Sequence, residues 1–389
     1  MANPAALPWL GFRRTDGRIG IRNCLAVISA TDAANPVARR LAAAVPGAVA
    51  ITPLYGRGQL GDDLALSIRT MVGLGTNPNV YAVLVVSLEP VAGARVAEAI
   101  AAAGTPVEML SIQSLSGTPN LQARGTVLLD AWRSDAVRVA RTPFVEGELS
   151  IGLECGGSDS SSGLVSNPAI GLVCDRLVDA GARLVFSEPV ECLGGEAALD
   201  ARAASPAVAA AIRDTILKYE RIAEAAQVNL NAVNPAPDNI RGGLTTIEEK
   251  SLGAICKTGT RPISGVLSYG APAPAPGLYL MDAPAPATEN ITALSAGGAH
   301  AILFGTGALN SIGSPVSPTI KICGNPRTCA AMPVHIDVPL GDVVTGETSL
   351  QAAGERIYAG LRKVACGALT AAERLGELEV AISRIRPSI

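Results

Sequence analysis

Residues 150–171 read SIGLECGGSDSSSGLVSNPAIG and join a strand, a turn and the start of a helix. We predict a buried strand at 150–154, a glycine- and serine-rich turn after it, and a helix whose start is marked by Asn167-Pro168. Units of strand, turn and helix that repeat along a chain build a parallel sheet covered by helices on both faces. The stretch therefore predicts an α/β fold.

The same alternation of strands and helices extends to both sides of this stretch. Most of the expected strands are continuous apolar runs, which is the pattern of a parallel sheet with both faces covered. We predict two doubly wound, Rossmann-like α/β domains, residues 11–142 and residues 148–389. The second domain is the larger one, and the sequence is compatible with either one lobe or two in it. The expected strands outside 150–154 are residues 21–29, 49–52, 81–87, 106–110, 183–188, 264–270, 277–284, 301–305 and 319–323.

Composition limits the kinds of protein that this chain can be. Its 389 residues are 48% hydrophobic and only 17% charged, with 31 Lys and Arg against 34 Asp and Glu. So small a charged fraction excludes a disordered polymer, and the even spread of both signs argues against a nucleic-acid-binding stripe. No apolar stretch of about 18 residues is free of Gly, Pro or charge, so we expect no membrane span. Eight cysteines without a CxxC pair predict a reducing, cytoplasmic location.

The turn after residue 154 is the first candidate for a functional site. Loops at the carboxyl ends of parallel strands bind ligands in open α/β sheets, because backbone N–H groups and the helix dipole point toward them. Cys155, Ser158 and Asp159 would add a soft ligand, a hydroxyl group and a carboxylate there. A simple glycine-rich connection between strand and helix explains the same sequence equally well.

A second candidate lies in NIRGGLTTIEEKSLG, residues 239–253. Two glycines precede Thr245, Glu249 and Lys250, and charges beside such a turn suit acid–base chemistry. Alternatively, Thr245 begins a helix and pairs with Glu248 in a capping box.

Further charged candidates follow other expected strands. In TIKICGNPRTC (319–329), Lys321 and Arg327 form a cation pair that suits a carboxylate or sulfonate, although solvation of both at the surface is the simpler interpretation. In PLYGRGQLGDD (53–63), Arg57 lies between glycines and is a candidate anion hook. In SEPVECLGGE (187–196), Glu188 lies where a strand finishes.

Several motifs in unbroken order resemble the altronate/galactarate dehydratase family. They are GFRRTDGRIGIRN (11–23), TNPNVYAVLVV (76–86), CGGSDSSSGLVSNPAIG (155–171), FSEPVECLGGEAAL (186–199), GGLTTIEEKSLGAI (242–255), GLYLMD (277–282) and TIKICGNP (319–326). The resemblance runs from about Gly11 to the C-terminus and corresponds to the large catalytic part of the family. It implies metal-assisted elimination from a 2-hydroxy acid to give a 2-oxo acid, with Fe²⁺ as the expected metal. It also implies a small partner subunit and an oligomer.

One turn departs from the sugar-acid dehydratases of this family, which typically carry a His and a Gly-Cys pair where this chain has TPLYGRGQLGDD (52–63). The chain resembles instead the branch that releases sulfite from (2R)-sulfolactate, in this turn and in the segments TNPNV (76–80), SLEP (87–90) and GNPRT (324–328). The segment CGGSD (155–159), in contrast, is nearer to the dehydratases. We therefore predict a carbon–sulfur lyase that gives pyruvate and sulfite. A sugar-acid hydro-lyase is the alternative, and a non-catalytic binding subunit is a third interpretation.

The resemblance and the local chemistry together suggest roles for these residues. Lys250 or Glu249 is the expected base, with Glu188 as a further catalytic residue. The expected substrate-binding residues are Arg57, Gly156, Gly157, Ser158, Ser162, Asn167, Thr245, Thr246, Lys321, Asn325 and Arg327.

The expected metal ligands are Cys155, Asp159 and Glu188. An iron–sulfur cluster that uses Cys155 and Cys323 is less favoured, because the local cysteine spacing of such clusters is missing.

Overall fold

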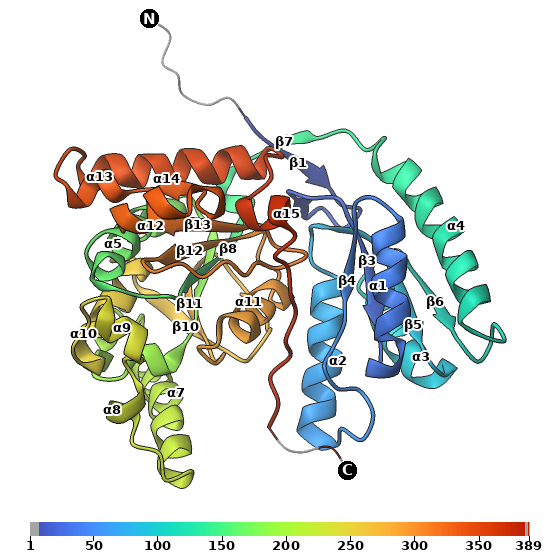
Figure 1. Ribbon diagram of the computed structural model, residues 1–389, viewed down its shortest axis with the longest axis horizontal. Helices are drawn as coiled ribbons and strands as arrows, with labels where there is room; N and C mark the ends of the chain where they lie inside the picture. Colours follow the sequence, from blue (N-terminus) through green and yellow to red (C-terminus); the bar gives the residue numbers. More distant parts are fainter. Residues whose placement is uncertain (1–7, 386–387, 389) are drawn as a thin grey trace, which may run out of the picture.

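A computed structural model describes residues 8–385 and residue 388 of the chain. Within these residues the strands form a four-stranded and a seven-stranded parallel sheet and a small antiparallel sheet of three strands (Figure 1). The two parallel sheets confirm the prediction of an α/β fold. The larger region contains one continuous sheet. Residues 386–387 and 389 of the expected second domain lie outside the described residues.

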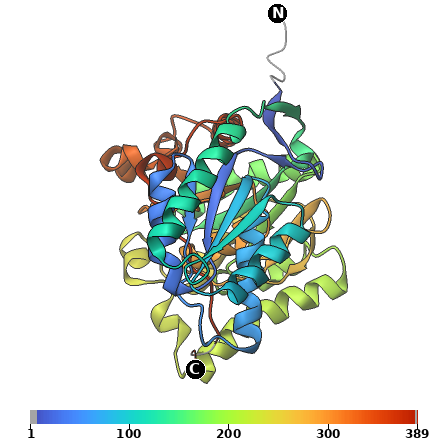
Figure 2. The same ribbon diagram turned by 90° about the vertical axis from the view of Figure 1, so that its right-hand side faces the viewer.

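The four-stranded sheet belongs to the N-terminal domain and has the strand order β4-β3-β5-β6. Apolar side chains of α1 and α4 cover one face, and apolar side chains of α2 and α3 pack with valines of β5 on the other face. Figure 2 looks onto this domain and shows helices lying over its strands. The elements are β3 (Cys24–Ser29), α1 (Asn35–Ala44), β4 (Ala48–Ile51), α2 (Gly61–Gly75), β5 (Val80–Ser87), α3 (Pro90–Ala102), β6 (Val107–Ser111) and α4 (Thr118–Ala136).

The seven-stranded sheet forms the C-terminal domain, in the order β10-β11-β9-β8-β12-β13-β14. The strands are β8 (Ser150–Cys155), β9 (Arg183–Phe186), β10 (Ile263–Leu267), β11 (Gly277–Met281), β12 (Ala301–Thr306), β13 (Thr319–Cys323) and β14 (Val338–Pro339). Its longer helices are α5 (Asn167–Asp179), α7 (Pro206–Ala225), α10 (Ile247–Ile255), α11 (Ala287–Ala296) and α14 (Leu350–Ala365). Short helices are α6 (Glu196–Asp200), α8 (Leu230–Val233), α9 (Pro237–Arg241), α12 (Pro326–Ala331), α13 (Gly341–Val344) and α15 (Ala371–Leu375).

The two domains share one apolar core, because α2 of the first packs on α11 of the second. Met71 and Leu74 of α2 belong to the same buried cluster as Ile291 and Leu294 of α11. Gly73 makes the close approach possible, since a methyl group on it would lie 2.4 Å from the carbonyl oxygen of Ala296. No helix among the described residues is long and apolar enough to cross a membrane.

The antiparallel sheet joins the beginning of the chain to the connection between the domains. Its strands β1 (Trp9–Arg13), β2 (Ile19–Gly20) and β7 (Thr142–Phe144) pair in the order β2-β1-β7. The sequence did not predict this sheet, because β7 falls at the boundary between the two expected domains. Trp9 and Phe144 are buried there and pack into the core of the C-terminal domain.

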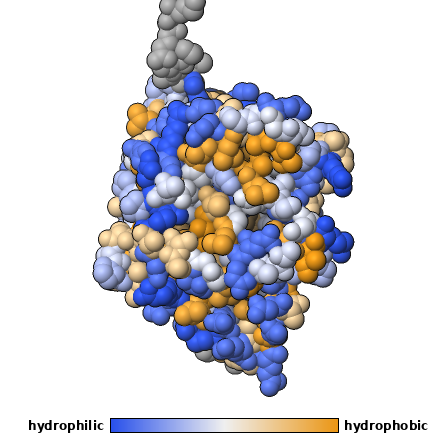
Figure 3. All heavy atoms as spheres, turned by 90° about the vertical axis from the view of Figure 1, so that its left-hand side faces the viewer, coloured by the Kyte–Doolittle hydropathy of each residue, from blue (hydrophilic) through white to orange (hydrophobic). Residues whose placement is uncertain are grey.

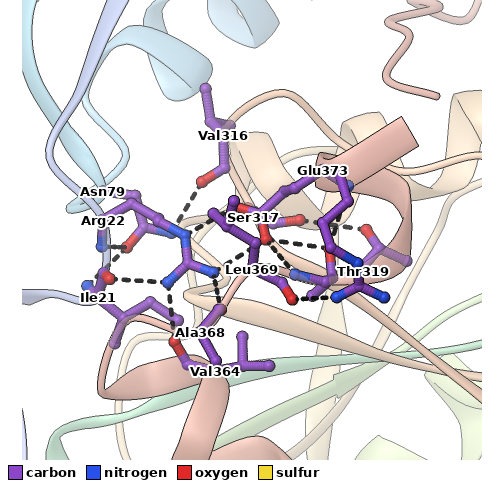
Figure 4. Close-up of polar contacts among 12 residues, drawn as sticks. Ile21, Arg22, Asn79, Val316, Ser317, Thr319, Val364, Ala368, Leu369 and Glu373 are labelled. Atoms are coloured by element: carbon purple, nitrogen blue, oxygen red, sulfur yellow. Dashed lines mark hydrogen bonds and ion pairs between the residues drawn. The ribbon is translucent and has the colours of Figure 1, made fainter. Parts of the chain in front are cut away.

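The motifs at the start of the chain serve the domain interface. The Arg22 guanidinium pairs with the Glu373 carboxylate at 2.7 Å and donates to the carbonyl groups of Val364 and Ala368 at 2.8 and 2.7 Å. Figure 4 shows this side chain pointing at all three partners. The Arg22 and Glu373 side chains are only 10% and 16% exposed. The GIRN segment therefore fastens the first domain to the end of the second.

Asn79 makes a second polar connection between the domains. Its amide nitrogen donates to the carbonyl groups of His300 and Val316, each at 2.8 Å. Its oxygen accepts from the Ile21 N–H at 2.8 Å, and Figure 4 shows Asn79 between Ile21 and Val316. The asparagine is completely buried. The NPNV segment thus has a structural role, which explains a motif that carries no obvious chemistry.

Removing Arg22 is expected to destabilise the protein strongly. Arg22→Ala would leave the half-buried Glu373 carboxylate and two carbonyl groups without their partner, which should lower the free energy of unfolding by about 3 kcal/mol. Arg138→Ala is the matched control, because its ion pair with Asp135 is exposed and such pairs contribute under about 1 kcal/mol. Urea midpoints measure both variants. Equal shifts in the two would contradict the interface role of Arg22.

Candidate active site

A buried cluster of three side chains lies at the carboxyl edge of the seven-stranded sheet. Cys155 ends β8, Glu188 follows β9, and Lys257 lies in the short helix Cys256–Thr258 that continues α10. The Lys257 ammonium nitrogen is 2.8 Å from Oε2 of Glu188 and 3.0 Å from Sγ of Cys155. Carboxyl ends of parallel strands are where such folds bind ligands. The cluster is therefore our candidate for the catalytic centre.

Burial sets the protonation of this cluster. The Lys257 and Glu188 side chains are 3% and 1% exposed. Burial alone would lower the pKa of Lys257, but its acidic neighbours, among them the Glu188 carboxylate at 2.8 Å, outweigh it and hold this pKa well above the ordinary value. Burial raises the pKa of Glu188 although Lys257 opposes the shift, and it raises the pKa of Cys155 to about 12. Lys257 is therefore a fixed cation, Cys155 an un-ionised thiol, and Glu188 a carboxylate suited to accept a proton.

The backbone holds both ends of the ion pair in place. Glu188 has a φ of 66°, in the left-handed region that a non-glycine residue rarely adopts. Such a conformation costs on the order of 1 kcal/mol and is typical of functional sites. On the other side, Gly171 of α5 lets the Lys257 segment approach, because a methyl group there would lie 2.3 Å from the carbonyl oxygen of Cys256.

A second Lys–Glu pair lies beside the first. The Lys250 ammonium nitrogen is 3.0 Å from the Glu191 carboxylate and 2.7 Å from the side-chain oxygen of Asn234. Lys250 and Glu191 are each 11% exposed. Lys250 and Lys257 are seven residues apart, so they lie on the same side of α10 and its continuation. The two pairs together place two cations and two carboxylates along one edge of the site.

Two further charged residues are buried within the sheet itself. Glu154 is in register with Phe304 and Phe304 with Lys321, so all three side chains lie on the same face of β8, β12 and β13. Neither oxygen of Glu154 has a hydrogen-bond partner among the described residues. Burial and the nearby Glu188 raise the pKa of Glu154 well above its usual value. Lys321 donates to the carbonyl of Ile312 at 2.5 Å and lies 3.5 Å from the Phe304 ring centre.

Asp159 fastens two loops instead of joining the cluster. Its carboxylate accepts from the Asn325 side chain at 2.7 Å, from the Ser161 hydroxyl at 2.6 Å and from the Ser162 N–H at 3.0 Å. Asn325 also caps α12. Gly307 leaves the room that this carboxylate needs, because a methyl group there would lie 2.0 Å from Oδ1 of Asp159. The bonds tie the loop after β8 to the loop after β13.

The predicted metal ligands do not converge in this structure. Cys155 and Glu188 share the Lys257 ammonium, whereas the oxygens of Asp159 are hydrogen-bonded to Asn325 and Ser161. Among residues 8–385 and 388, no group of three His, Cys, Asp or Glu side chains is placed to hold a metal ion. The set as it stands does not fit a metal, so we derive no catalytic step through one. The divalent metal stays a prediction.

Cys155 ends β8 and Cys323 ends β13, two strands that β12 separates, and the two side chains point to opposite faces of the sheet. Cys155 is in register with Gly305, and Cys323 with the next residue, Thr306. Successive residues of a strand point to opposite faces. The two sulfurs are therefore not arranged as a pair of cluster ligands.

The other turn residues mainly connect loops. Gly156 donates its N–H to the Gly305 carbonyl, the Gly157 carbonyl accepts from two backbone N–H groups, and the Ser158 carbonyl accepts from Asn239. The Asn167 side chain donates to the Gly253 carbonyl at 2.9 Å, while its buried side-chain oxygen has no partner among the described residues. This oxygen is an acceptor that a ligand hydroxyl could use.

The helix that carries Lys250 starts one residue later than the sequence indicated. Thr246, not Thr245, caps α10 and accepts from the Glu249 N–H at 3.1 Å. The backbone N–H and hydroxyl of Thr245 donate to the Glu249 carboxylate, and the hydroxyl bond lowers the pKa of Glu249. Glu249 is exposed and already bonded, so it suits helix capping better than proton abstraction.

The predicted cation clamp is not assembled here. Lys321 is completely buried, so the surface interpretation is wrong for it, whereas Arg327 is exposed on the first turn of α12. Arg57 is exposed in the loop between β4 and α2, which belong to the other domain (Figure 1). Asp62 and Asp63 lie in the first turn of α2.

Lys257 is the residue that the sequence reasoning missed. Its segment CKTG (256–259) carries no motif, whereas the charged residues ahead of it indicated Lys250 and Glu249 as the base. The available signal was the spacing of seven residues from Lys250, which places the two side chains on one helix face.

Comparison with known proteins identifies the family. Residues 147–388 match the family model described as D-galactarate/altronate dehydratase, C-terminal, and residues 11–137 match the one described as D-galactarate dehydratase/altronate hydrolase, second domain. The chain belongs to the D-galactarate/altronate dehydratase family. This membership confirms the resemblance found in the sequence motifs.

Three curated relatives of this family illustrate the similarity. The chain is 39% identical to (2R)-sulfolactate sulfo-lyase subunit beta of Chromohalobacter salexigens, over 98% of both chains. It is 33% identical to altronate dehydratase of Bacillus subtilis, over 85% of this chain and 68% of that enzyme. It is 31% identical to altronate dehydratase of Escherichia coli, over 95% of this chain and 76% of that enzyme. These names confirm the prediction of a lyase.

The buried Lys321 predicts a distinctive pH dependence of stability. Burial lowers its pKa from 10.5 to about 7, against the attraction of Glu154, Asp337 and Glu377. Between these values the unfolded chain binds a proton that the folded chain does not, so this residue's contribution to stability rises with pH from about 7 to about 10.5. Below pH 7 the full desolvation of its charge opposes folding.

Lys321→Met should therefore gain stability relative to the wild type at pH 6.5 and lose that advantage by pH 9.5. Urea unfolding across this range measures it, with the exposed Lys218→Met as control. A constant difference between Lys321→Met and the wild type across the range would show that Lys321 keeps its proton when folded.

Cys329 is expected to be the most reactive thiol. A hydrogen bond with Cys323 lowers the pKa of Cys329 to about 7. Desolvation raises the pKa of Cys256 above its ordinary value, although Cys256 is the more exposed residue. The thiolate is the nucleophile, so iodoacetamide at pH 7.5 should modify Cys329 before Cys256 and leave Cys155 unmodified. Peptide mass spectrometry after short reaction times gives the order. Faster modification of Cys256 would show that exposure, not ionisation, controls reactivity.

Proposed function

We propose that this chain is the large subunit of a lyase that converts (2R)-sulfolactate to pyruvate and sulfite. The observation that carries the proposal is the 39% identity to the sulfo-lyase subunit over 98% of both chains. The resemblance of the turn at residues 52–63 to the same branch points in this direction as well.

The reaction requires removal of a weakly acidic proton. A base takes the proton from C2 of sulfolactate, the electron pair of that bond forms the C2–C3 double bond, and sulfite leaves C3 with the electrons of the C–S bond. The enol of pyruvate that remains loses its hydroxyl proton and takes up a proton at C3, which gives the 2-oxo acid. Negative charge spreads toward the substrate carboxylate as the C2 proton leaves, so a fixed cation near that carboxylate lowers the barrier.

Glu188 and Lys257 supply these two functions in the proposal. The buried Glu188 carboxylate, whose pKa is raised, is the base that accepts the C2 proton. The Lys257 ammonium beside it keeps its proton and stabilises the charge that develops on the substrate carboxylate. Cys155 remains a neutral thiol that donates no charge to the site.

Lys250 gives a second cation for a substrate that carries both a carboxylate and a sulfonate. This role replaces that of a base for Lys250, because the Lys250 ammonium is already held between Glu191 and Asn234. The substrate would enter on this side, where Lys250 and Glu191 are 11% exposed and the inner pair is nearly closed.

A neighbouring pocket is a poor alternative entrance. It has a volume of about 650 Å³ and lies between α7, α8 and the start of α10. Its lining includes Glu196, Glu220, Glu224 and Glu248 against the single cation Arg213. A dianionic substrate would be repelled from so acidic a surface.

A relative named subunit beta supports a partner subunit and an oligomer for this chain as well. The eight free cysteines fit the cytoplasmic location. Elemental analysis of the purified complex tests the expected iron.

Dehydration of altronate or galactarate is the second candidate function, favoured by the 31–33% identity to altronate dehydratases.

Sulfite release by the complex tests the proposal. Lys257→Met should lower kcat by about 100-fold, since loss of one group that stabilises transition-state charge typically has this effect. Lys218→Met, which removes an exposed ammonium paired with Asp282, should keep wild-type activity. Circular dichroism establishes that both variants are folded.

Two outcomes would contradict the proposal. Equal kcat values for Lys257→Met and Lys218→Met would remove Lys257 from the reaction. Formation of 2-oxo acid from altronate or galactarate, without sulfite from sulfolactate, would establish the dehydratase instead.

A further inference from the structure

An apolar groove lies between the antiparallel sheet and α14, away from the candidate active site. Its volume is about 1430 Å³. Figure 1 shows the N-terminal end of the described chain, β1, β7 and α14 meeting at the top of the molecule. The residues that line the groove are Pro8, Trp9, Leu10, Pro143, Phe144, Val145, Glu146, Gly147, Glu148, Arg176, Ala180, Glu355, Tyr358, Ala359, Arg362, Lys363 and Cys366.

Aromatic side chains are concentrated at this groove. The ring centroid of Trp9 is 5.9 Å from that of Phe144 and 5.7 Å from that of Tyr358, and the Arg176 guanidinium lies 3.4 Å from the centre of the Tyr358 ring. The whole chain has only four Phe, two Trp and six Tyr. Aromatic residues and Arg are the types enriched where proteins bind each other.

The rim of the groove has the mixed charge of an interface. Glu146, Glu148 and Glu355 lie among Arg176, Arg362 and Lys363. Val145 is 66% exposed at the edge, and Ala359 is exposed on α14. Figure 3 views the left-hand side of Figure 1 and shows that apolar atoms also gather in patches on the surface of the C-terminal domain.

The order of domains in the family indicates what covers the groove. The match at residues 11–137 is to a second domain, so a first domain precedes this position in relatives that carry one. The altronate dehydratases extend beyond the region matched to this chain, which covers 68% and 76% of their length. Residues 8–10, directly before the match, line the groove. A first domain in those relatives would therefore be attached at the edge of this surface.

We propose that the groove is the docking surface for a small partner polypeptide that corresponds to the family's first domain. This inference rests on the proposed function, in which the chain works with a partner subunit. The partner inserts apolar side chains beside Trp9 and Tyr358 and meets the charged rim with its own polar groups. A fully buried aromatic centre inside a polar rim is the usual arrangement of binding energy in such interfaces.

The groove and the active site lie at opposite ends of β8. Glu148 lines the groove just before Ser150 begins the strand, and Cys155 ends it. A strand of this length extends over roughly 20 Å. Substitutions in the groove should therefore change binding of the partner without touching the Lys257 cluster.

Affinity for a defined probe tests this proposal. The probe is the polypeptide of the same genome that matches the first domain of the D-galactarate dehydratase/altronate hydrolase family, purified on its own. Ala359→Arg and Val145→Asp should each raise the Kd for the full chain by at least about tenfold, because they place charge in the groove. Ala210→Arg, exposed on α7 outside the groove, and Val127→Asp, 67% exposed on α4, are matched controls that should keep the wild-type Kd.

Hydrogen exchange adds a measurement that a folding defect cannot imitate. In the wild-type chain, residues 355–366 should exchange more slowly when the probe is added. Unchanged Kd values for both groove variants, or slow exchange of these residues that the probe does not alter, would overturn the proposal. The second result would mean that the groove is already filled by another copy or another part of the chain.

Activity separates this inference from the proposed function. Sulfite release together with unchanged binding of Ala359→Arg contradicts the docking surface alone. Weakened binding of the variants in a complex that releases no sulfite supports the docking surface and contradicts the proposed reaction.

Discussion

The ion pair between Lys257 and Glu188 is buried at the carboxyl edge of the large sheet, where water solvates neither charge. Two such charges are stable only when each is paired and hydrogen-bonded, and here the 2.8 Å contact is supported by the Cys155 thiol and backbone. The pair needs β8, β9 and the end of α10 to converge, so it depends on the whole parallel sheet. The roles proposed for this pair, a base and a fixed cation, are what an elimination from a 2-hydroxy acid requires.

The two domains contribute in different ways to this arrangement. The seven-stranded sheet supplies the ends of β8 and β9, and the loop bond between Asp159 and Asn325 closes the edge beside them. The N-terminal domain is fixed against this sheet by Arg22, Asn79 and the close approach of α2 to α11. Motifs at residues 11–23 and 76–80 are therefore explained by assembly of the molecule, while the candidate catalytic residues lie in the C-terminal domain.

Sequence patterns predicted the α/β class and the principal strands, because buried parallel strands are apolar runs whatever their neighbours. They missed β7, since a three-residue strand with a proline at its centre carries no apolar run. The candidate site was predicted in part: Glu188 and Lys250 lie where expected at strand and helix ends. Lys257 has no motif, and the burial of Lys321 apart from Arg327, its expected partner in a cation pair, was not predicted, because burial and pairing come from contacts between segments far apart in sequence. For the same reason the sequence could not indicate that Cys155 and Glu188 lie apart from Asp159 among the described residues.

The central claim is that Glu188 removes the C2 proton of sulfolactate beside the Lys257 cation. The most direct measurement compares sulfite release from (2R)-sulfolactate and from its C2-deuterated form by the complex, for the wild type and Glu188→Gln. We expect deuterium to lower kcat/KM in the wild type, and Glu188→Gln to lose turnover while it still binds the substrate. Equal rates for both substrates together with an active Glu188→Gln would contradict the account.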